Sequence, residues 1–167
     1  MKRYDSYDGA PFSEEFTGGA VRFLDLSVPQ LWLPSYDWVV CLEVIEHIPS
    51  EFESIVLDNV IRPAKVGVVL SWAYPTQPGT MHVNGRPLEY VHEELKRRGL
   101  TPDVAATEHL RTSSVLEWFQ TNIVVFRKTN GKFNSSISPL GHLPSRGVLT
   151  PVQWTTQARQ INISTGY

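Results

Sequence analysis

The chain has 167 residues, of which 41% are hydrophobic, and this is enough for one domain with a buried core. Its formal net charge of -2 argues against a nucleic-acid surface driven by charge. The single cysteine, Cys41, excludes an internal disulfide. The sequence shows no secretory signal and no apolar run of membrane-spanning length, so the cytoplasm is the default expectation for its location.

The first part of the chain predicts short elements separated by turns. Residues 3–8 predict a short strand, residues 12–16 a turn or short helix, and residues 21–24 a second strand. Pro29 and Pro34 then predict an irregular connection.

The clearest strand lies at residues 38–42, where a continuous apolar run is typical of a parallel strand buried on both faces. Ser50 and Glu53 have the spacing of a capping box, which predicts a helix over residues 51–60. A second apolar run over residues 67–72 predicts the next buried strand. The order strand, helix, strand indicates the parallel crossover of doubly wound folds.

The remaining elements follow a proline- and glycine-rich loop at residues 75–87. Apolar spacing predicts a helix over residues 88–98, and residues 101–106 favour a short strand. A second capping box predicts a helix over residues 114–120, and a β-branched run over residues 123–126 predicts the last strand.

The apolar pattern stops near residue 129. Residues 130–167 are rich in Ser, Thr, Asn, Gly and Pro, and their composition cannot offset the entropy cost of ordering. We therefore expect a folded part over residues 1–129 and a mostly disordered tail over residues 130–167.

The run Glu-Val-Ile-Glu-His-Ile-Pro at residues 43–49 directly follows the apolar strand. Ligands of open α/β sheets bind beyond the carboxyl ends of strands, so Glu43, Glu46 and His47 predict a site there. The strand and this run together resemble the fourth-strand motif of class I S-adenosylmethionine-dependent methyltransferases. More specifically, the chain resembles the methyltransferase-like proteins of animals.

Three further stretches carry the same resemblance, which covers about residues 3–129. They are Tyr-Asp-Gly-Ala-Pro at 7–11, Val-Arg-Phe-Leu-Asp-Leu at 21–26 and His-Val-Asn-Gly-Arg-Pro at 82–87. The resemblance implies an α/β fold with a Rossmann-like doubly wound sheet, mostly parallel with an antiparallel last strand. The family begins with a strand and a glycine-rich loop, and no such loop precedes the first of these stretches. We therefore expect an amino-terminally truncated domain that lacks this first strand.

The resemblance also implies S-adenosyl-L-methionine as the cofactor and assigns residues to it. Asp8, next to Gly9, would accept hydrogen bonds from the ribose hydroxyls. Asp25 would accept a hydrogen bond from the adenine amino group, and the backbone N–H of Leu26 would also contribute to adenine binding. Glu43 would lie next to the cofactor. The alternatives are a turn aspartate at Asp8, a loop or cap carboxylate at Asp25 and a solvated strand end at Glu43.

The catalytic candidates are Glu46 and His47, which would position or deprotonate a methyl acceptor. The alternative for His47 is a structural hydrogen bond that fixes the turn. In the loop that follows the next strand, His82, Asn84 and Arg86 are candidates for substrate binding, and the alternative is a solvent-exposed connection.

The sequence predicts no metal site, because His82 and His92 have no companions at a convincing ligand spacing. The leading hypothesis is a methyltransferase that acts on an unidentified small-molecule or protein acceptor. The alternative is a non-catalytic fragment or pseudoenzyme that acts through protein contacts. A nicotinamide-dependent oxidoreductase is the weakest hypothesis, because no G-x-G-x-x-G pattern is present.

Overall fold

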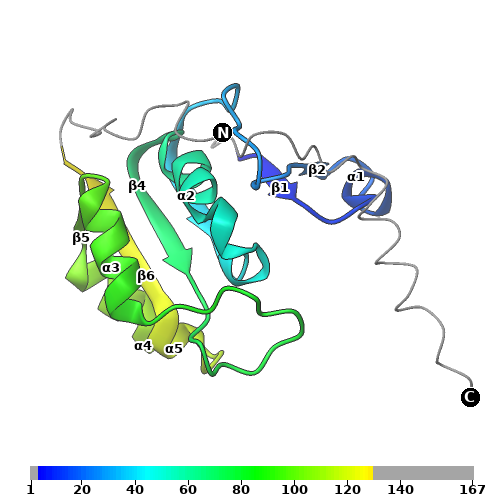
Figure 1. Cartoon of the computed structure of the whole chain (residues 1–167). Coiled ribbons are helices and arrows are strands. Elements are labelled where there is room, and N and C mark those ends of the chain that lie inside the picture. The colour runs from blue at the N-terminus through cyan, green and yellow to red at the C-terminus, as the bar shows by residue number, and fades with distance from the viewer. Residues whose placement is uncertain (1–3, 130–167) are drawn as a thin grey trace, which may run out of the picture. The chain divides into compact units, whose positions relative to one another are not determined.

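A computed structural model describes residues 4–129, and the predicted tail over residues 130–167 lies outside the described residues. Within the described part, strands are mixed with helices along the chain, as the sequence predicts (Figure 1). Two short 3₁₀ turns follow the third strand. No helix between residues 4 and 129 combines the length and apolar character needed to cross a membrane. The elements are β1 (Ser6–Asp8), α1 (Ser13–Phe16), β2 (Val21–Phe23), β3 (Tyr36–Cys41), the 3₁₀ turns Ile45–His47 and Ser50–Phe52, α2 (Glu53–Ile61), β4 (Ala64–Ser71), α3 (Leu88–Arg97), β5 (Leu100–Pro102), α4 (Val104–Ser113), α5 (Phe119–Asn122) and β6 (Ile123–Lys128).

The strands form two sheets, a parallel pair β1–β2 and a four-stranded sheet in the order β3-β4-β6-β5. β3 and β4 are parallel and joined by α2, while β6 is antiparallel to both β4 and β5. The fold is therefore α/β with a mixed sheet. Residues 21–24 were expected to lie in one sheet with the later strands, but among the described residues β2 pairs only with β1.

The core lies between the four-stranded sheet and its helices. Val68 of β4 and Phe126 of β6 are fully buried, and α2 and α3 contribute the buried Leu57 and Leu95. Trp72, just beyond β4, is also buried, and its indole N–H donates to the carbonyl of Asn84 at 2.6 Å. This bond attaches the long loop after β4 to the core.

β3 is less buried than the sequence predicts. Val40 is 61% exposed and Trp38 is 36% exposed, whereas Cys41 is buried. The reason is that β3 pairs only with β4 within the described residues, so it is an edge strand of its sheet. Burial raises the pKa of the Cys41 thiol to about 12, which fits an inert, small core residue.

The capping box predicted at Ser50 and Glu53 does not form. Ser50 makes no side-chain cap, and α2 begins at Glu53 itself. The Glu53 carboxylate instead accepts hydrogen bonds from Arg86 and Tyr90. The Glu53 side chain therefore forms an ion pair with Arg86 in place of the predicted local cap.

The second capping box is also wrong, because Ser114 ends a helix instead of starting one. Its hydroxyl donates to the carbonyl of Leu110 at 2.7 Å, in the last turn of α4. The predicted strand over residues 101–106 is confirmed only to Pro102. α4 follows because the Asp103 carboxylate accepts the N–H of Ala106 at 3.0 Å, which makes Asp103 the N-cap.

Candidate functional site

The turn after β3 places Glu43 in an unusual conformation, with a φ of 52°. This left-handed region is uncommon for a residue other than glycine. Ser71, at the end of β4, accepts the Glu43 N–H and donates to its Oε1, both at 2.7 Å. Asn122 donates to the same Oε1 at 2.9 Å, and Gln77 donates to Oε2 at 3.1 Å. Residues from three later segments therefore fix the Glu43 carboxylate.

Glu46, in the 3₁₀ turn that follows, is fully buried. Neither carboxylate oxygen has a hydrogen-bond partner among residues 4–129. Its backbone carbonyl accepts the N–H groups of Val83 and Asn84 at 2.8 and 2.9 Å, which ties the long loop to the turn. Burial, together with the charge of the nearby Glu43, raises the pKa of the Glu46 carboxyl to about 7.

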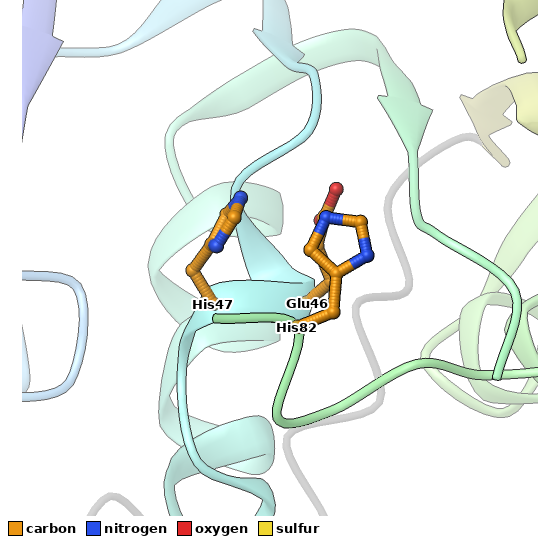
Figure 2. Close-up of side chains that lie close together, drawn as sticks. All are labelled: Glu46, His47 and His82. Carbon is orange, nitrogen blue, oxygen red and sulfur yellow. The ribbon is translucent and has the colours of Figure 1, made fainter. Parts of the chain in front are cut away.

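His47 and His82 lie beside this carboxylate, and Figure 2 shows the three side chains gathered in one place. The ring centroids of the two histidines are 5.0 Å apart in an edge-on arrangement. Nδ1 of His47 lies 3.3 Å from the carbonyl of Met81, and Nδ1 of His82 lies 3.2 Å from the carbonyl of Gln77. The potential ligand atoms of Glu46, His47 and His82 all lie within 4.8 Å of one another.

The other two loop candidates lie around a different carboxylate, that of Glu53. Arg86 donates to its Oε2 through Nε and Nη2 at 3.1 and 2.9 Å. Tyr90 donates to Oε1, and Asn84, which is buried, contacts Oε2 at 3.4 Å. Asn84 and Arg86 thus attach the loop to α2, and their predicted role in substrate binding stays a prediction.

Asp8 and Asp25 lie at the ends of the parallel pair β1–β2. Asp8 is exposed, and its Oδ1 accepts the N–H of Ala10 at 2.7 Å, in a tight turn through Gly9. Oδ1 of Asp25 accepts the N–H and the hydroxyl of Ser27 at 2.8 and 2.6 Å. Both carboxylates therefore use one oxygen in a local turn, and their predicted cofactor contacts stay predictions.

Leu26 packs against the core, and its carbonyl accepts the amide of Asn59, a buried residue of α2. The same amide donates to the carbonyl of Val28 at 2.8 Å, and Oδ1 of Asn59 accepts the N–H of Gln30 at 2.8 Å. Asn59 therefore attaches the segment after β2 to the core. Its role could not be predicted from the sequence, since an asparagine within a helix carries no local signal for it.

Several residues of the Glu43 environment were also missed. Ser71, Gln77 and Asn122 contact one carboxylate, but Asn122 is 79 positions away from it in the chain. No local pattern predicts such a contact. The polar Ser71 at the end of an apolar strand was the only available signal, because a fully buried serine there needs a partner.

No protein-family model matches the sequence, and no curated protein matches it. Among solved structures, the chain is similar to magnesium protoporphyrin IX methyltransferase (ChlM) from Synechocystis PCC 6803 with bound SAH. The identity is 18% over 70% of this chain and 56% of that chain, with a TM-score of 0.47. It is also similar to LepI in complex with SAM, with 10% identity over 77% of this chain and 37% of that chain and a TM-score of 0.47. The pyocyanin biosynthetic protein PhzM is similar as well, with 16% identity over 71% of this chain and 38% of that chain and a TM-score of 0.42. The chain thus spans little more than half the length of these proteins at most, and the likeness concerns the general chain path alone.

Proposed function

We propose that the chain forms part of an S-adenosylmethionine-dependent methyltransferase domain that acts on a small-molecule or protein acceptor. One observation carries the proposal: Asp8, Asp25 and Glu43 each lie at or just after the carboxyl end of a strand of a parallel pair. This is the edge where open α/β sheets bind their ligands. The resemblance of residues 37–49 to a methyltransferase motif supports the same function.

Each carboxylate has a proposed task toward the cofactor. Asp8 accepts the ribose hydroxyls, and Gly9 beside it lets the ligand approach the backbone closely. Asp25 and the N–H of Leu26 recognise the adenine. Glu43 lies next to the cofactor, and the bonds from Ser71 and Asn122 hold its carboxylate in one orientation.

The cofactor supplies the methyl group from its sulfonium, and the protein contributes alignment and exclusion of water. Glu46 and His47 are proposed to position the acceptor and to accept its proton. A carboxyl with a pKa of about 7 suits the second task near neutral pH. The loop with His82, Asn84 and Arg86 is proposed to contact the acceptor, with His82 as the member nearest to Glu46.

We also propose that a strand and a glycine-rich loop outside this sequence complete the sheet between β1 and β3. Among the described residues, β1 pairs only with β2, and β3 pairs only with β4. The Tyr36 hydroxyl of β3 lies 2.9 Å from the Tyr7 hydroxyl of β1 and donates to Asp5 at 2.9 Å. β1 and β3 are therefore connected by side-chain hydrogen bonds, although no backbone hydrogen bonds pair them among the described residues. On this proposal, the chain by itself binds the cofactor weakly and transfers methyl groups poorly.

Isothermal titration calorimetry on a chain extended with the coding sequence upstream of Met1 tests the function. We expect Asp8→Ala to weaken binding of S-adenosylmethionine by about 1.5–3 kcal/mol, the range for hydrogen bonds to a charged group. Asp37→Ala, an exposed aspartate of β3, is the matched control. Unchanged affinity in Asp8→Ala would remove Asp8 from the site. Binding without methyl transfer to any acceptor would favour the non-catalytic alternative.

A further inference from the structure

We propose that Glu46, His47 and His82 form a binding site for one divalent transition-metal ion of the zinc type. The three side chains come from the turn after β3 and from the loop after β4 (Figure 2). Their potential ligand atoms lie within 4.8 Å of one another. Metal binding can be tested without methyl transfer, because it requires only these three residues and the ion, and a bound ion would replace proton acceptance by Glu46 and His47 as the role of these side chains.

The first support is the state of Glu46. It is fully buried, no donor within the described chain bonds to either of its oxygens, and the nearby Glu43 carboxylate carries the same charge. A buried carboxylate without partners is strongly unfavourable, so native proteins pair it with a cation or a set of donors. A metal ion between Glu46 and the two imidazoles would supply the missing positive charge.

The second support is the orientation of the two rings. In each histidine, Nδ1 lies close to a backbone carbonyl, that of Met81 for His47 and that of Gln77 for His82. A carbonyl accepts only, so each Nδ1 carries the proton and each Nε2 carries a lone pair. Metal-binding histidines commonly make this hydrogen bond, because it fixes the tautomer and the ring orientation.

The donor set indicates the class of ion. Two imidazole nitrogens and one carboxylate oxygen suit zinc and its transition-metal neighbours, whereas magnesium and calcium prefer oxygen ligands alone. Three protein ligands leave one tetrahedral position for water or a bound oxygen, as in catalytic zinc sites. Glu43 is not a fourth ligand, because Ser71, Gln77 and Asn122 already occupy its oxygens.

To bind an ion, the three ligand atoms must move slightly closer to one another. Bonds of about 2.0–2.1 Å place tetrahedral ligand atoms roughly 3.3 Å apart, closer than the 4.8 Å limit observed. His47 is exposed, so its ring can rotate toward Glu46, and the half-buried His82 lies in a loop and not in a helix or strand. Gly79 packs directly against the His82 ring, and a Cβ at this position would overlap its Nε2 and Cε1 atoms. The glycine therefore allows the ring to occupy its place beside Glu46.

Titration of the full chain with zinc after removal of metals by a chelator tests the site. We expect one ion per chain, with His47→Ala, His82→Ala and Glu46→Gln each weakening binding by more than about 100-fold. His109→Ala, an exposed histidine of α4, is the matched control and should bind zinc as the wild type does. Cobalt(II) in place of zinc should give the visible spectrum of a four-coordinate ion, and this spectrum should be lost in the same variants.

Gly79→Ala gives a further test, because it removes no ligand. We expect it to displace the His82 ring and to weaken zinc binding by about 10–100-fold, the range for residues that orient a ligand. Since His47 is exposed, His47→Ala should keep the fold even where a buried variant does not. A folded wild type that binds no zinc would overturn the proposal. Unchanged zinc affinity in folded His47→Ala would overturn it as well.

Discussion

Two buried carboxylates, Glu53 and Glu46, contact the same loop in opposite ways. Glu53 accepts hydrogen bonds from Arg86, Tyr90 and Asn84. Glu46 is buried at least as deeply, and its carboxylate has no hydrogen-bond donor among residues 4–129. This difference indicates that Glu53 stabilises the fold and that Glu46 does not. A compensated charge stabilises a structure, whereas an uncompensated one costs stability and is typical of sites where chemistry or binding takes place.

The loop between β4 and α3 is attached at both carboxylates, but by different groups. At Glu53 the attachment is made by side chains, and at Glu46 it is made by the backbone N–H groups of Val83 and Asn84. The backbone bonds place the loop correctly without using the Glu46 carboxylate. That carboxylate is therefore left available for a proton, an acceptor or a metal ion.

The largest expected effect is the loss of the Glu53 carboxylate. Glu53→Ala leaves Arg86 and Asn84 without their partner, and breaking a buried ion pair costs about 3–5 kcal/mol. Since the Arg86 side chain is 32% exposed, we expect the lower end, about 3 kcal/mol of unfolding free energy. Urea denaturation measures it, with the exposed Glu51→Ala as control. A cost below about 1 kcal/mol would show that Glu53 is not the anchor of the loop.

Glu46→Gln should have the opposite sign in metal-free protein. The folded-state pKa of about 7 lies above the ordinary value of 4.5, so the folded state binds more protons between these values. Wild-type stability therefore falls as the pH rises from about 4.5 to 7, whereas glutamine does not titrate. We expect Glu46→Gln to be more stable than the wild type by about 1–3 kcal/mol at pH 8, with the pH-dependent part of this difference lost near pH 4.

Thermal melts across this pH range, in the presence of a chelator, check the prediction. Glu53→Gln is the contrasting variant, since it should lose stability at pH 8. If Glu46→Gln were as destabilising at pH 8 as Glu53→Gln, the two carboxylates would have the same structural role and the comparison would fail.

Local sequence patterns predicted most elements of the four-stranded sheet and the helices α2 and α3. These elements are continuous apolar runs or regular apolar spacings, so a short window contains the whole signal. α4 was missed because its start depends on the Asp103 cap, which a predicted strand over the same residues concealed. The exposure of Val40 was missed because it depends on which strand lies next to β3.

The site was predicted only in part, for the same reason. Glu43, Glu46 and His47 are neighbours in sequence, so their common location at the end of β3 was visible in a single motif. His82 lies close to Glu46 only because the loop after β4 folds back toward the turn after β3. The position of this loop depends in turn on its contacts with Glu53, which is far away in the sequence. The prediction of no metal site relied on the spacing of possible ligands along the chain. This spacing cannot show that the loop after β4 folds back and brings His82 next to Glu46.

Tyr90→Phe tests the Glu53 cluster by a smaller change. It removes one hydrogen bond to a buried carboxylate and keeps the ring that packs edge-on against Trp72. Burial and this bond raise the pKa of the Tyr90 hydroxyl to about 12, so the hydroxyl is a donor at all working pH values. We expect a loss of about 1–2 kcal/mol, because the Arg86 bonds remain. Chemical denaturation measures it, and a neutral result would assign the compensation of Glu53 to Arg86 and Asn84.

The smallest expected effect belongs to His47→Ala in the presence of a chelator. His47 is exposed, and its described polar contact is one long bond to the Met81 carbonyl, so unfolding free energy should change by less than about 0.5 kcal/mol. With zinc at about 100 times its dissociation constant, the wild type should gain about 2.7 kcal/mol through linkage. His47→Ala should gain almost none of this at the same zinc concentration. Parallel denaturation curves with chelator and with zinc measure both numbers. A large loss already in chelator would mean that His47 holds the turn as a structural residue, and equal zinc stabilisation of both proteins would place the ion elsewhere.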